Sequence, residues 1–326
     1  MVTREKRCGV LFGLIGLAIV LTVGCRREPL PADSQATVAE PVVAAADATK
    51  LRVAVSVLPQ AQFVERVGGE HVDVQVLVGP GQSPHTYEPT ALQLAALAEA
   101  RLLFSVGMPY EEALLSRIRG AFERLEVVDT RQGIALRQIE AHSHAHDHDG
   151  HEHVHGPSCA GHDGDDPHIW LSPRLAKIQA RTICDALSRV LPERADEFER
   201  NLAAFHAELD AVDARIAELL APLAGRDLVV FHPSYGYFAD AYGLRQVAVE
   251  TAGKEPSPRE LAALLAQIKA AGTRVVFVQP QFSTRSAETI AAHIGGRVVQ
   301  LDPLARDYVA NLETMATTIA QALTGD

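Results

Sequence analysis

The sequence predicts an α/β fold built from parallel sheets, because two kinds of segment alternate along it. Short runs rich in Val, Ile and Leu recur at even intervals, and Ala- and Leu-rich stretches with helical spacing separate them. Strands that alternate with helices form parallel sheets covered on both faces. With 326 residues, of which 47% are hydrophobic, the chain is long for one domain and comfortable for two.

The N-terminus is typical of a secretory signal. Arg4, Lys6 and Arg7 precede a run over residues 8–24 that contains no charged side chain, as in the basic and apolar regions of a signal peptide. A run this short scarcely spans a bilayer. We therefore interpret residues 1–24 as a signal peptide, with an uncleaved membrane anchor as the alternative.

The apolar run ends in Leu-Thr-Val-Gly-Cys at residues 21–25, which resembles a bacterial lipobox, where the Cys is acylated and becomes the first mature residue. Thr22 departs from the Leu that usually stands there. Residues 25–49 are rich in Ala, Pro and Val, show no clear period and predict a flexible tether. We expect a protein of the periplasm or cell envelope that is held to the membrane by a lipid on Cys25.

Eight short apolar runs are the candidate strands, four in each half of the folded part. They lie at residues 51–57, 72–78, 102–106, 125–129, 228–231, 246–250, 274–278 and 297–301. Helical patterns such as residues 258–271 separate them. The two halves predict an N-terminal lobe over residues 50–172 and a C-terminal lobe over residues 223–326.

Two helices are predicted in the connecting region, residues 173–222. They cover residues 173–190 and 192–220, and each opens with Pro, whose missing N–H costs nothing at a first helical position. The second is roughly 43 Å long at 1.5 Å per residue. One apolar stripe follows its length, formed by Phe198, Leu202, Phe205, Leu209, Val212, Ile216 and Leu219. Such a helix can brace two lobes, and an ordinary surface helix of one large domain is the alternative.

Histidine density is the clearest chemical signal. Eight of the 14 histidines gather in residues 142–162, namely His142, His144, His146, His148, His151, His153, His155 and His162. Imidazole suits Zn(II), Cu(II) and Ni(II) better than Mg(II) or Ca(II), so this His-rich segment predicts auxiliary binding of a transition metal. A solvated low-complexity loop is the alternative. Because only neutral imidazole coordinates, we expect this binding to vanish as the pH falls through about 6.5.

Four other candidate ligands fall at matching places in the predicted fold. His85 follows the second predicted strand, and His168 precedes a helix. His232 ends the fifth strand and Asp302 ends the eighth. Ligands of open parallel sheets bind beyond the carboxyl ends of strands, which predicts a metal site in the cleft between the lobes.

Taken singly, each of these residues more often has a role other than binding a metal. A His after a strand is more often a hydrogen-bonded loop residue, and an Asp before Pro often starts a turn. The joint case is stronger. Prolines at 84, 167, 233 and 303 adjoin all four candidates, and their fixed φ limits the backbone entropy lost when the ligands are held.

Five motifs surround these positions. They are Pro-His-Thr-Tyr-Glu-Pro (84–89), Asp-Pro-His-Ile-Trp-Leu-Ser-Pro (166–173), Phe-His-Pro-Ser-Tyr-Gly-Tyr-Phe (231–238), Gln-Pro-Gln-Phe-Ser (279–283) and Leu-Asp-Pro-Leu (301–304). Together they resemble the metal-binding solute-binding proteins of ABC importers, in the zinc and manganese uptake group. The resemblance covers residues 51–323.

The resemblance implies two lobes, each a four-stranded parallel sheet with flanking helices, joined by a long rigid helix. It implies one metal site at their interface, with His85, His168, His232 and Asp302 as ligands. Manganese members of the family have what looks like Glu where His232 stands. Three imidazoles and one carboxylate favour Zn(II), since Mn(II) sites are richer in oxygen. Some zinc members carry an acidic residue in the place of Pro84, so Asp302 is taken as the fourth ligand.

The function that follows is capture of Zn(II) outside the inner membrane by a monomer and its delivery to an ABC permease with its ATPase. Alternatives are uptake of manganese or ferrous iron, and a zinc store or adhesin without transport. A zinc hydrolase needs an open coordination position and a general base, and four ligands without a His-Glu-x-x-His motif argue against an enzyme. The net charge of −11, or −13 without residues 1–24, argues against a nucleic-acid partner.

Several side chains keep two interpretations. Glu88, three residues after His85, either accepts a hydrogen bond from that imidazole and orients it or caps a helix. Cys159 and Cys184 can pair after export, or Cys159 can be a metal ligand or a bystander. Tyr235, Tyr237 and Phe238 either wall the pocket or belong to the core.

Overall fold

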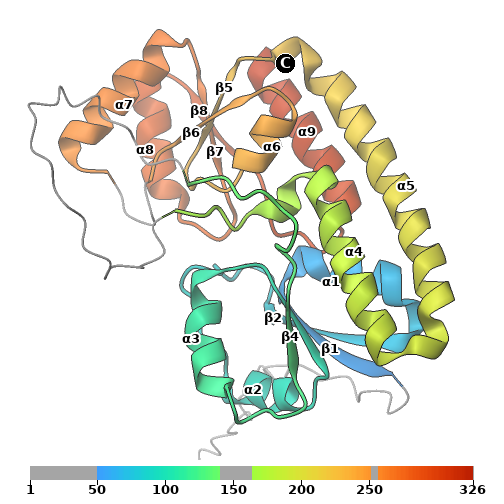
Figure 1. The fold of residues 1–326 in the computed structure, drawn as a ribbon. Coiled ribbons are helices and arrows are strands. Elements are labelled where there is room, and N and C mark those ends of the chain that lie inside the picture. The colour runs from blue at the N-terminus through green and yellow to red at the C-terminus, as the bar shows by residue number, and fades with distance from the viewer. Residues whose placement is uncertain (1–49, 140–163, 251–255, 326) are drawn as a thin grey trace, which may run out of the picture. The chain divides into compact units, whose positions relative to one another are not determined.

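Two four-stranded parallel sheets, with helices packed on them, make up the computed structural model (Figure 1). The structure describes residues 50–139, 164–250 and 256–325. The predicted α/β class with two parallel sheets and a long helix is confirmed.

Some of the predicted features lie outside the described residues. These are the signal peptide at 1–24, the tether at 25–49 with Cys25, and the His-rich segment at 142–162 with its eight histidines and Cys159. Within the described residues, no helix is long and apolar enough to cross a membrane.

The N-terminal sheet has the strand order β2-β1-β3-β4, with every neighbour parallel. Its strands are β1 (Leu51–Val57), β2 (Val72–Val78), β3 (Leu102–Ser105) and β4 (Glu126–Asp129). The helices between them are α1 (Leu58–Gly68), the short 3-10 helix η1 (Gly69–His71), α2 (Ala91–Ala98) and α3 (Pro109–Ile118). Thr90 caps α2, because its side chain accepts the N–H of Gln93 while the Gln93 side chain accepts the N–H of Thr90.

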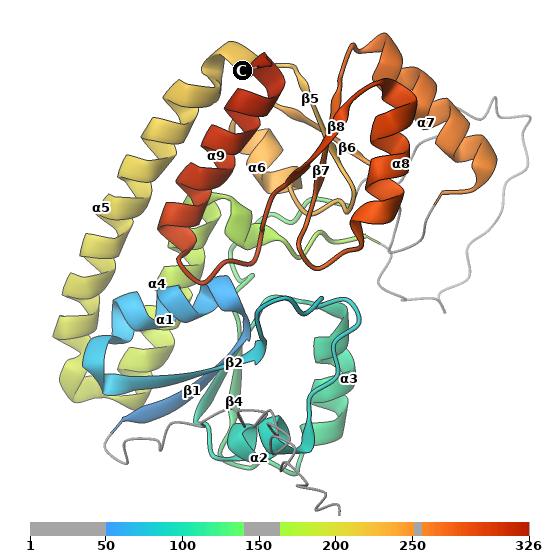
Figure 2. The same cartoon turned by 180° about the vertical axis from the view of Figure 1, so that it is seen from behind.

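The C-terminal sheet repeats the scheme with the order β6-β5-β7-β8. Its strands are β5 (Asp227–Val230), β6 (Arg245–Ala248), β7 (Val275–Val278) and β8 (Arg297–Gln300). Its helices are α6 (Gly236–Ala241), α7 (Pro258–Ala270), α8 (Thr284–Ile294) and α9 (Tyr308–Thr324). Helices α7 and α8 cover one face of this sheet (Figure 2), and Val229 and Val276 belong to one hydrophobic cluster with Leu264 and Ile290.

Helices α4 (Pro173–Val190) and α5 (Ala195–Leu220) connect the sheets, and three further 3-10 helices flank them: η2 (Ile169–Leu171), η3 (Pro192–Arg194) and η4 (Ala221–Leu223). Helix α5 packs on α1 of the first half, on α4 and on α9 of the second half (Figure 2). This confirms the long helix as a brace. The stripe ends differently from the prediction, because Leu219 is 42% exposed and Leu220 is buried.

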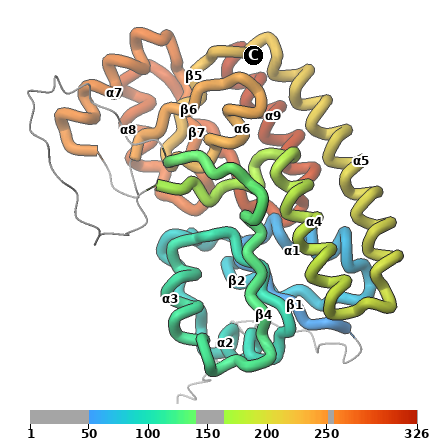
Figure 3. Tube along the Cα trace, viewed as in Figure 1, coloured from blue at the N-terminus to red at the C-terminus, as the bar shows by residue number. Residues whose placement is uncertain are grey.

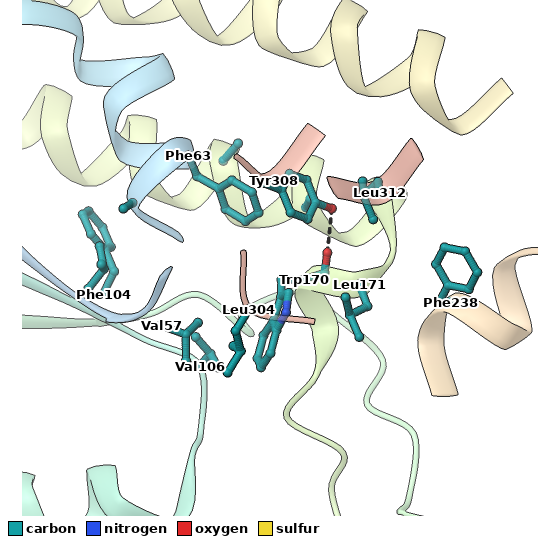
Figure 4. Packing of buried hydrophobic residues seen from close by; sticks show 14 of the residues in the cluster. Val57, Phe63, Phe104, Val106, Trp170, Leu171, Phe238, Leu304, Tyr308 and Leu312 are labelled. Atoms are coloured by element: carbon teal, nitrogen blue, oxygen red, sulfur yellow. Dashed lines mark hydrogen bonds between the residues drawn. The ribbon is translucent and has the colours of Figure 1, made fainter. Parts of the chain in front are cut away.

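One hydrophobic cluster runs through both halves, from the strands of the first sheet to α9. Figure 4 shows its middle, where the Tyr308 hydroxyl donates to the Trp170 carbonyl over 2.6 Å. Phe63 of α1 meets the Tyr308 ring edge-on, with centroids 4.8 Å apart. The Trp170 indole N–H donates to the Pro303 carbonyl over 2.8 Å. These contacts join the two sheets beside the predicted site.

Candidate metal centre

Three histidines from three separate loops converge. His85 lies in the loop after β2, His168 immediately precedes η2, and His232 lies two residues beyond the end of β5. One ring nitrogen of each lies within 4.8 Å of the others. The ring centroids are 4.3 Å apart for His85 and His232, 5.4 Å for His168 and His232, and 5.6 Å for His85 and His168. The spacing suits a single ion between them.

Local hydrogen bonds fix the loops that carry these rings. The Ser83 hydroxyl accepts the backbone N–H of His85 over 3.3 Å. The side-chain amide of Gln279 donates to the His232 carbonyl over 2.9 Å and to the Ser234 hydroxyl over 2.8 Å. The backbone of His168 donates to Oδ1 of Asp166 over 3.0 Å. These hydrogen bonds fix the backbone that carries the three rings.

A carboxylate contacts the Nδ1 atom of two of the three rings. Oδ1 of Asp166 lies 2.7 Å from Nδ1 of His168, and Glu250 Oε1 forms a short hydrogen bond with Nδ1 of His232. An ionised carboxylate only accepts hydrogen bonds, so both rings carry their proton on Nδ1. Their Nε2 lone pairs are then free for a metal. Nε2 of His232, like Nε2 of His85, is buried without a hydrogen-bond partner among the described residues.

The site favours neutral imidazole. Burial, together with the neighbouring rings of His232 and His168, lowers the pKa of His85 to about 2. Burial also lowers the pKa of His232, against the opposing effect of its hydrogen bond to Glu250. Because only neutral imidazole coordinates, the two groups are in the metal-binding form across the physiological pH range.

The pocket enclosed by the rings has a volume of about 10 Å³, room for about one water-sized sphere. Its walls include the stacked ring of Phe282, 5.1 Å from His232, and the ring of Trp170, 5.3 Å from His168. An organic solute cannot enter a space of this size. A bare ion can.

A larger cleft of about 1000 Å³ reaches the same rings, since His85 and His232 belong to its lining. Gln138, Ile139, Gly164 and Asp165 also line it. Gln138 and Asp165 form an antiparallel bridge there, and the two green segments that flank the grey trace run side by side in Figure 3. The chain thus leaves for residues 140–163 and returns from them at this cleft.

Asp302 directly precedes Pro303, which lines the small pocket, but it lies outside the group whose ligand atoms are within 4.8 Å of each other. Its Oδ1 accepts the Gln281 amide over 3.1 Å and the backbone N–H of Leu304 over 2.9 Å. Both neighbours line the small pocket. Its Oδ2 has no hydrogen bond among the described residues, so one oxygen remains available to a cation. The ligand role of Asp302 stays a prediction.

The other side chains singled out in the sequence occupy ordinary positions. Glu88 is exposed and, within the described residues, makes no hydrogen bond with His85, while Thr90 caps the helix that follows. Cys184 is a buried free thiol. Tyr235 and Phe238 belong to the hydrophobic core, and the Tyr237 hydroxyl donates to the Asp166 carbonyl over 3.0 Å.

Sequence reasoning missed Asp166 and Glu250. Asp166 was quoted as part of a motif, two residues before His168, and that Asp-x-His spacing is the signal that could have found it. Glu250 stood at the end of a predicted strand. It reaches His232 because β5 and β6 pair in parallel, with Val230 opposite Ala248, and the pairing of strands was not predicted.

Comparison with known proteins agrees with this geometry. The chain matches the family described as "Zinc-uptake complex component A periplasmic" over residues 53–322. A crystal structure of ZnuA is 41% identical, with a TM-score of 0.75, and the match covers 84% of this chain and 99% of that one. A deletion mutant of ZnuA with zinc bound is 40% identical, with a TM-score of 0.74, over 84% of this chain and 98% of that chain.

A curated relative is the zinc-binding lipoprotein AdcA of Streptococcus pneumoniae. It is 30% identical over 266 residues, which make up 78% of this chain and 50% of the relative. The chain therefore spans about half the length of that protein.

Proposed function

The chain belongs to the family of periplasmic A components of zinc-uptake complexes, and we propose that it captures Zn(II) outside the cytoplasm and delivers it to the permease of an ABC importer. Members of this family are solute-binding proteins that act with a permease and an ATPase, and they are not enzymes. Zn(II) is accordingly a cargo, bound and released without a chemical step.

The observation that carries the proposal is the convergence of three imidazoles on a pocket of about 10 Å³. Three nitrogen donors with Asp302 as a fourth, oxygen donor would make a four-coordinate shell, which suits Zn(II), whereas Mn(II) and Fe(II) sites are commonly richer in oxygen. The relatives with zinc in their names support the same choice of metal.

Elemental analysis of the purified protein, followed by competition between zinc and manganese, tests this assignment. We expect tight binding of zinc at the central site and displacement of bound manganese by equimolar zinc. Retention of manganese in the presence of zinc would refute the assignment of the metal.

Delivery is tested in cells that keep the permease and the ATPase but lack this chain. They should take up zinc poorly from zinc-depleted medium, and expression of the chain should restore uptake. Uptake that does not depend on the chain would instead support a zinc store or an adhesin. The proposed working form is a monomer, because all three histidines of the site come from one chain.

The proposal extends to two segments outside the described residues. A lipid on Cys25 would hold the protein at the membrane, and AdcA, itself named a lipoprotein, supports this idea. A Cys25→Ala variant should then appear in the soluble fraction. The His-rich segment over residues 142–162 would raise the local zinc concentration, since Ile139 and Gly164, the described residues that flank it, line the cleft that leads to His85 and His232.

A further inference from the structure

Two buried carboxylates each contact the Nδ1 atom of a histidine at the candidate metal centre. Asp166 is 1% exposed and contacts His168, and Glu250 is 4% exposed and contacts His232. His85 has no such hydrogen bond among the described residues. A buried carboxylate is costly unless donors compensate it, so these two positions call for an explanation.

The hydrogen bonds determine which nitrogen each ring presents. Because the carboxylates accept at Nδ1, the proton of each ring stays there and the lone pair lies on Nε2. In His232 that Nε2 atom is buried without a hydrogen-bond partner among the described residues, as is Nε2 of His85. Burying an acceptor without a donor is unfavourable, and a metal ion would satisfy these atoms together.

The two carboxylates differ in their contacts with groups other than the histidines. Oδ1 of Asp166 also accepts the backbone N–H of His168, and Oδ2 lies 3.7 Å from the Arg137 guanidinium. The negative charge of Asp166 is therefore shared. The only side-chain hydrogen bond of Glu250 within the described residues is the one to His232. Among the described residues, no Arg or Lys side chain forms an ion pair with Glu250, so its charge is not shared there as that of Asp166 is.

We propose that Asp166 and Glu250 are positioning residues for the cargo, each holding its histidine with Nε2 toward the metal, and that zinc affinity depends more on Glu250 than on Asp166. The inference rests on the proposed function. Its reason is that a carboxylate on Nδ1 fixes the orientation of the ring and makes Nε2 a stronger donor. The negative charge of Glu250 also attracts the positively charged zinc ion.

The test compares Glu250→Gln and Asp166→Asn in the full chain, with Glu288→Gln as the matched control. Glu288 lies on α8, is exposed and has no hydrogen bond among the described residues. Competition with a chelator should show zinc binding about 10- to 100-fold weaker for Glu250→Gln. We expect a smaller loss for Asp166→Asn and an unchanged affinity for Glu288→Gln.

A spectroscopic measurement on the zinc-free protein separates positioning from simple loss of structure. Nitrogen NMR of labelled histidine should show His232 protonated on Nδ1 in the wild type and a mixture of tautomers in Glu250→Gln, with the urea midpoint retained. Glu250→Asp, which keeps the charge, should recover part of the affinity.

Two results would overturn the inference: wild-type zinc affinity in Glu250→Gln, or a larger loss in Asp166→Asn than in Glu250→Gln. If the wild type itself bound no zinc, the proposed function would fail instead, so the two failures are distinguishable.

Discussion

Glu250 and His232 lie 18 residues apart in the chain and share a buried hydrogen bond at the metal centre. The pairing of β5 with β6 makes this contact, because the backbone N–H of Glu250 donates to the Phe231 carbonyl over 3.0 Å, next to the histidine. Sheet geometry thus places a candidate ligand and its supporting carboxylate together.

Replacement of His232 by alanine should weaken binding of one zinc ion by at least about 100-fold, because removing a ligand should cost no less than removing a group that supports one. Calorimetry with a competing chelator measures the loss. His293→Ala is the control, since His293 is exposed on α8 and its one hydrogen bond within the described part of the chain is to the Thr289 carbonyl of its own helix. Equal affinity in both variants would remove His232 from the site.

Deletion of residues 142–162 should leave one tight zinc site per chain and abolish the weaker sites. The three converging histidines all lie outside that segment, so their geometry does not require it. Titration of both proteins at pH 7 gives the stoichiometry. Loss of all tight binding in the deletion variant would contradict the separation between the central and auxiliary sites.

The metal-free protein should lose stability as the pH falls below about 6.5, the ordinary pKa of histidine. The pKa of His85 is about 2 in the folded chain, so between these values the unfolded chain binds more protons. The free energy of unfolding then falls with decreasing pH, and this contribution is fully present above pH 6.5. The lowered pKa of His232 acts in the same direction.

Urea unfolding with a chelator at pH 7 and pH 5 measures this effect. Each such histidine contributes up to about 1.4 kcal/mol per pH unit. A His85→Asn variant should show a weaker pH dependence than the wild type. An identical dependence would mean that His85 is not neutral in the folded protein.

Replacement of Tyr308 by phenylalanine should destabilise the protein by about 1–3 kcal/mol, because the buried Trp170 carbonyl loses the hydroxyl that donates to it. Chemical denaturation of the zinc-free protein checks this value. Zinc stoichiometry should stay at its wild-type value, since Tyr308 does not line the small pocket. An unchanged free energy of unfolding would show that the contact contributes nothing.

Much of the fold was predictable, because its signals are local. The eight predicted strands all occur, with ends shifted by at most two residues, and the helix at Pro173–Val190 has the predicted bounds. Helix α5 begins at Ala195, after a 3-10 turn over Pro192–Arg194. The predicted stripe continued from Ile216 to Leu219, three residues on. Leu220, four residues after Ile216, is buried in its place, because at this point the step of four stays on the apolar face of the helix and the step of three does not.

The candidate site was predictable only in part. The structure brings the candidate ligands His85, His168 and His232 together, and the positions of His85 and His232 followed from the rule that ligands bind beyond the carboxyl ends of parallel strands. Glu250 was missed because its contact depends on which strand lies beside β5, and no local pattern encodes that. For Asp302, the sequence indicates the place but not the direction of the side chain, so its role as a ligand remains a prediction.

The hydrophobic cluster that both halves share affects how the protein can release its metal ion. Wide separation of the halves would bring Trp170, Leu304 and Tyr308 into water, at about 25 cal/mol for each Å² of apolar surface. Release of the ion by wide opening of the two halves would therefore be unfavourable in free energy. Of the three histidines only His85 is not fully buried, and its loop lies outside helix and strand. Displacement of this one loop would remove a candidate ligand from the ion and would expose Tyr87 of the cluster, while Trp170, Leu304 and Tyr308 stay covered.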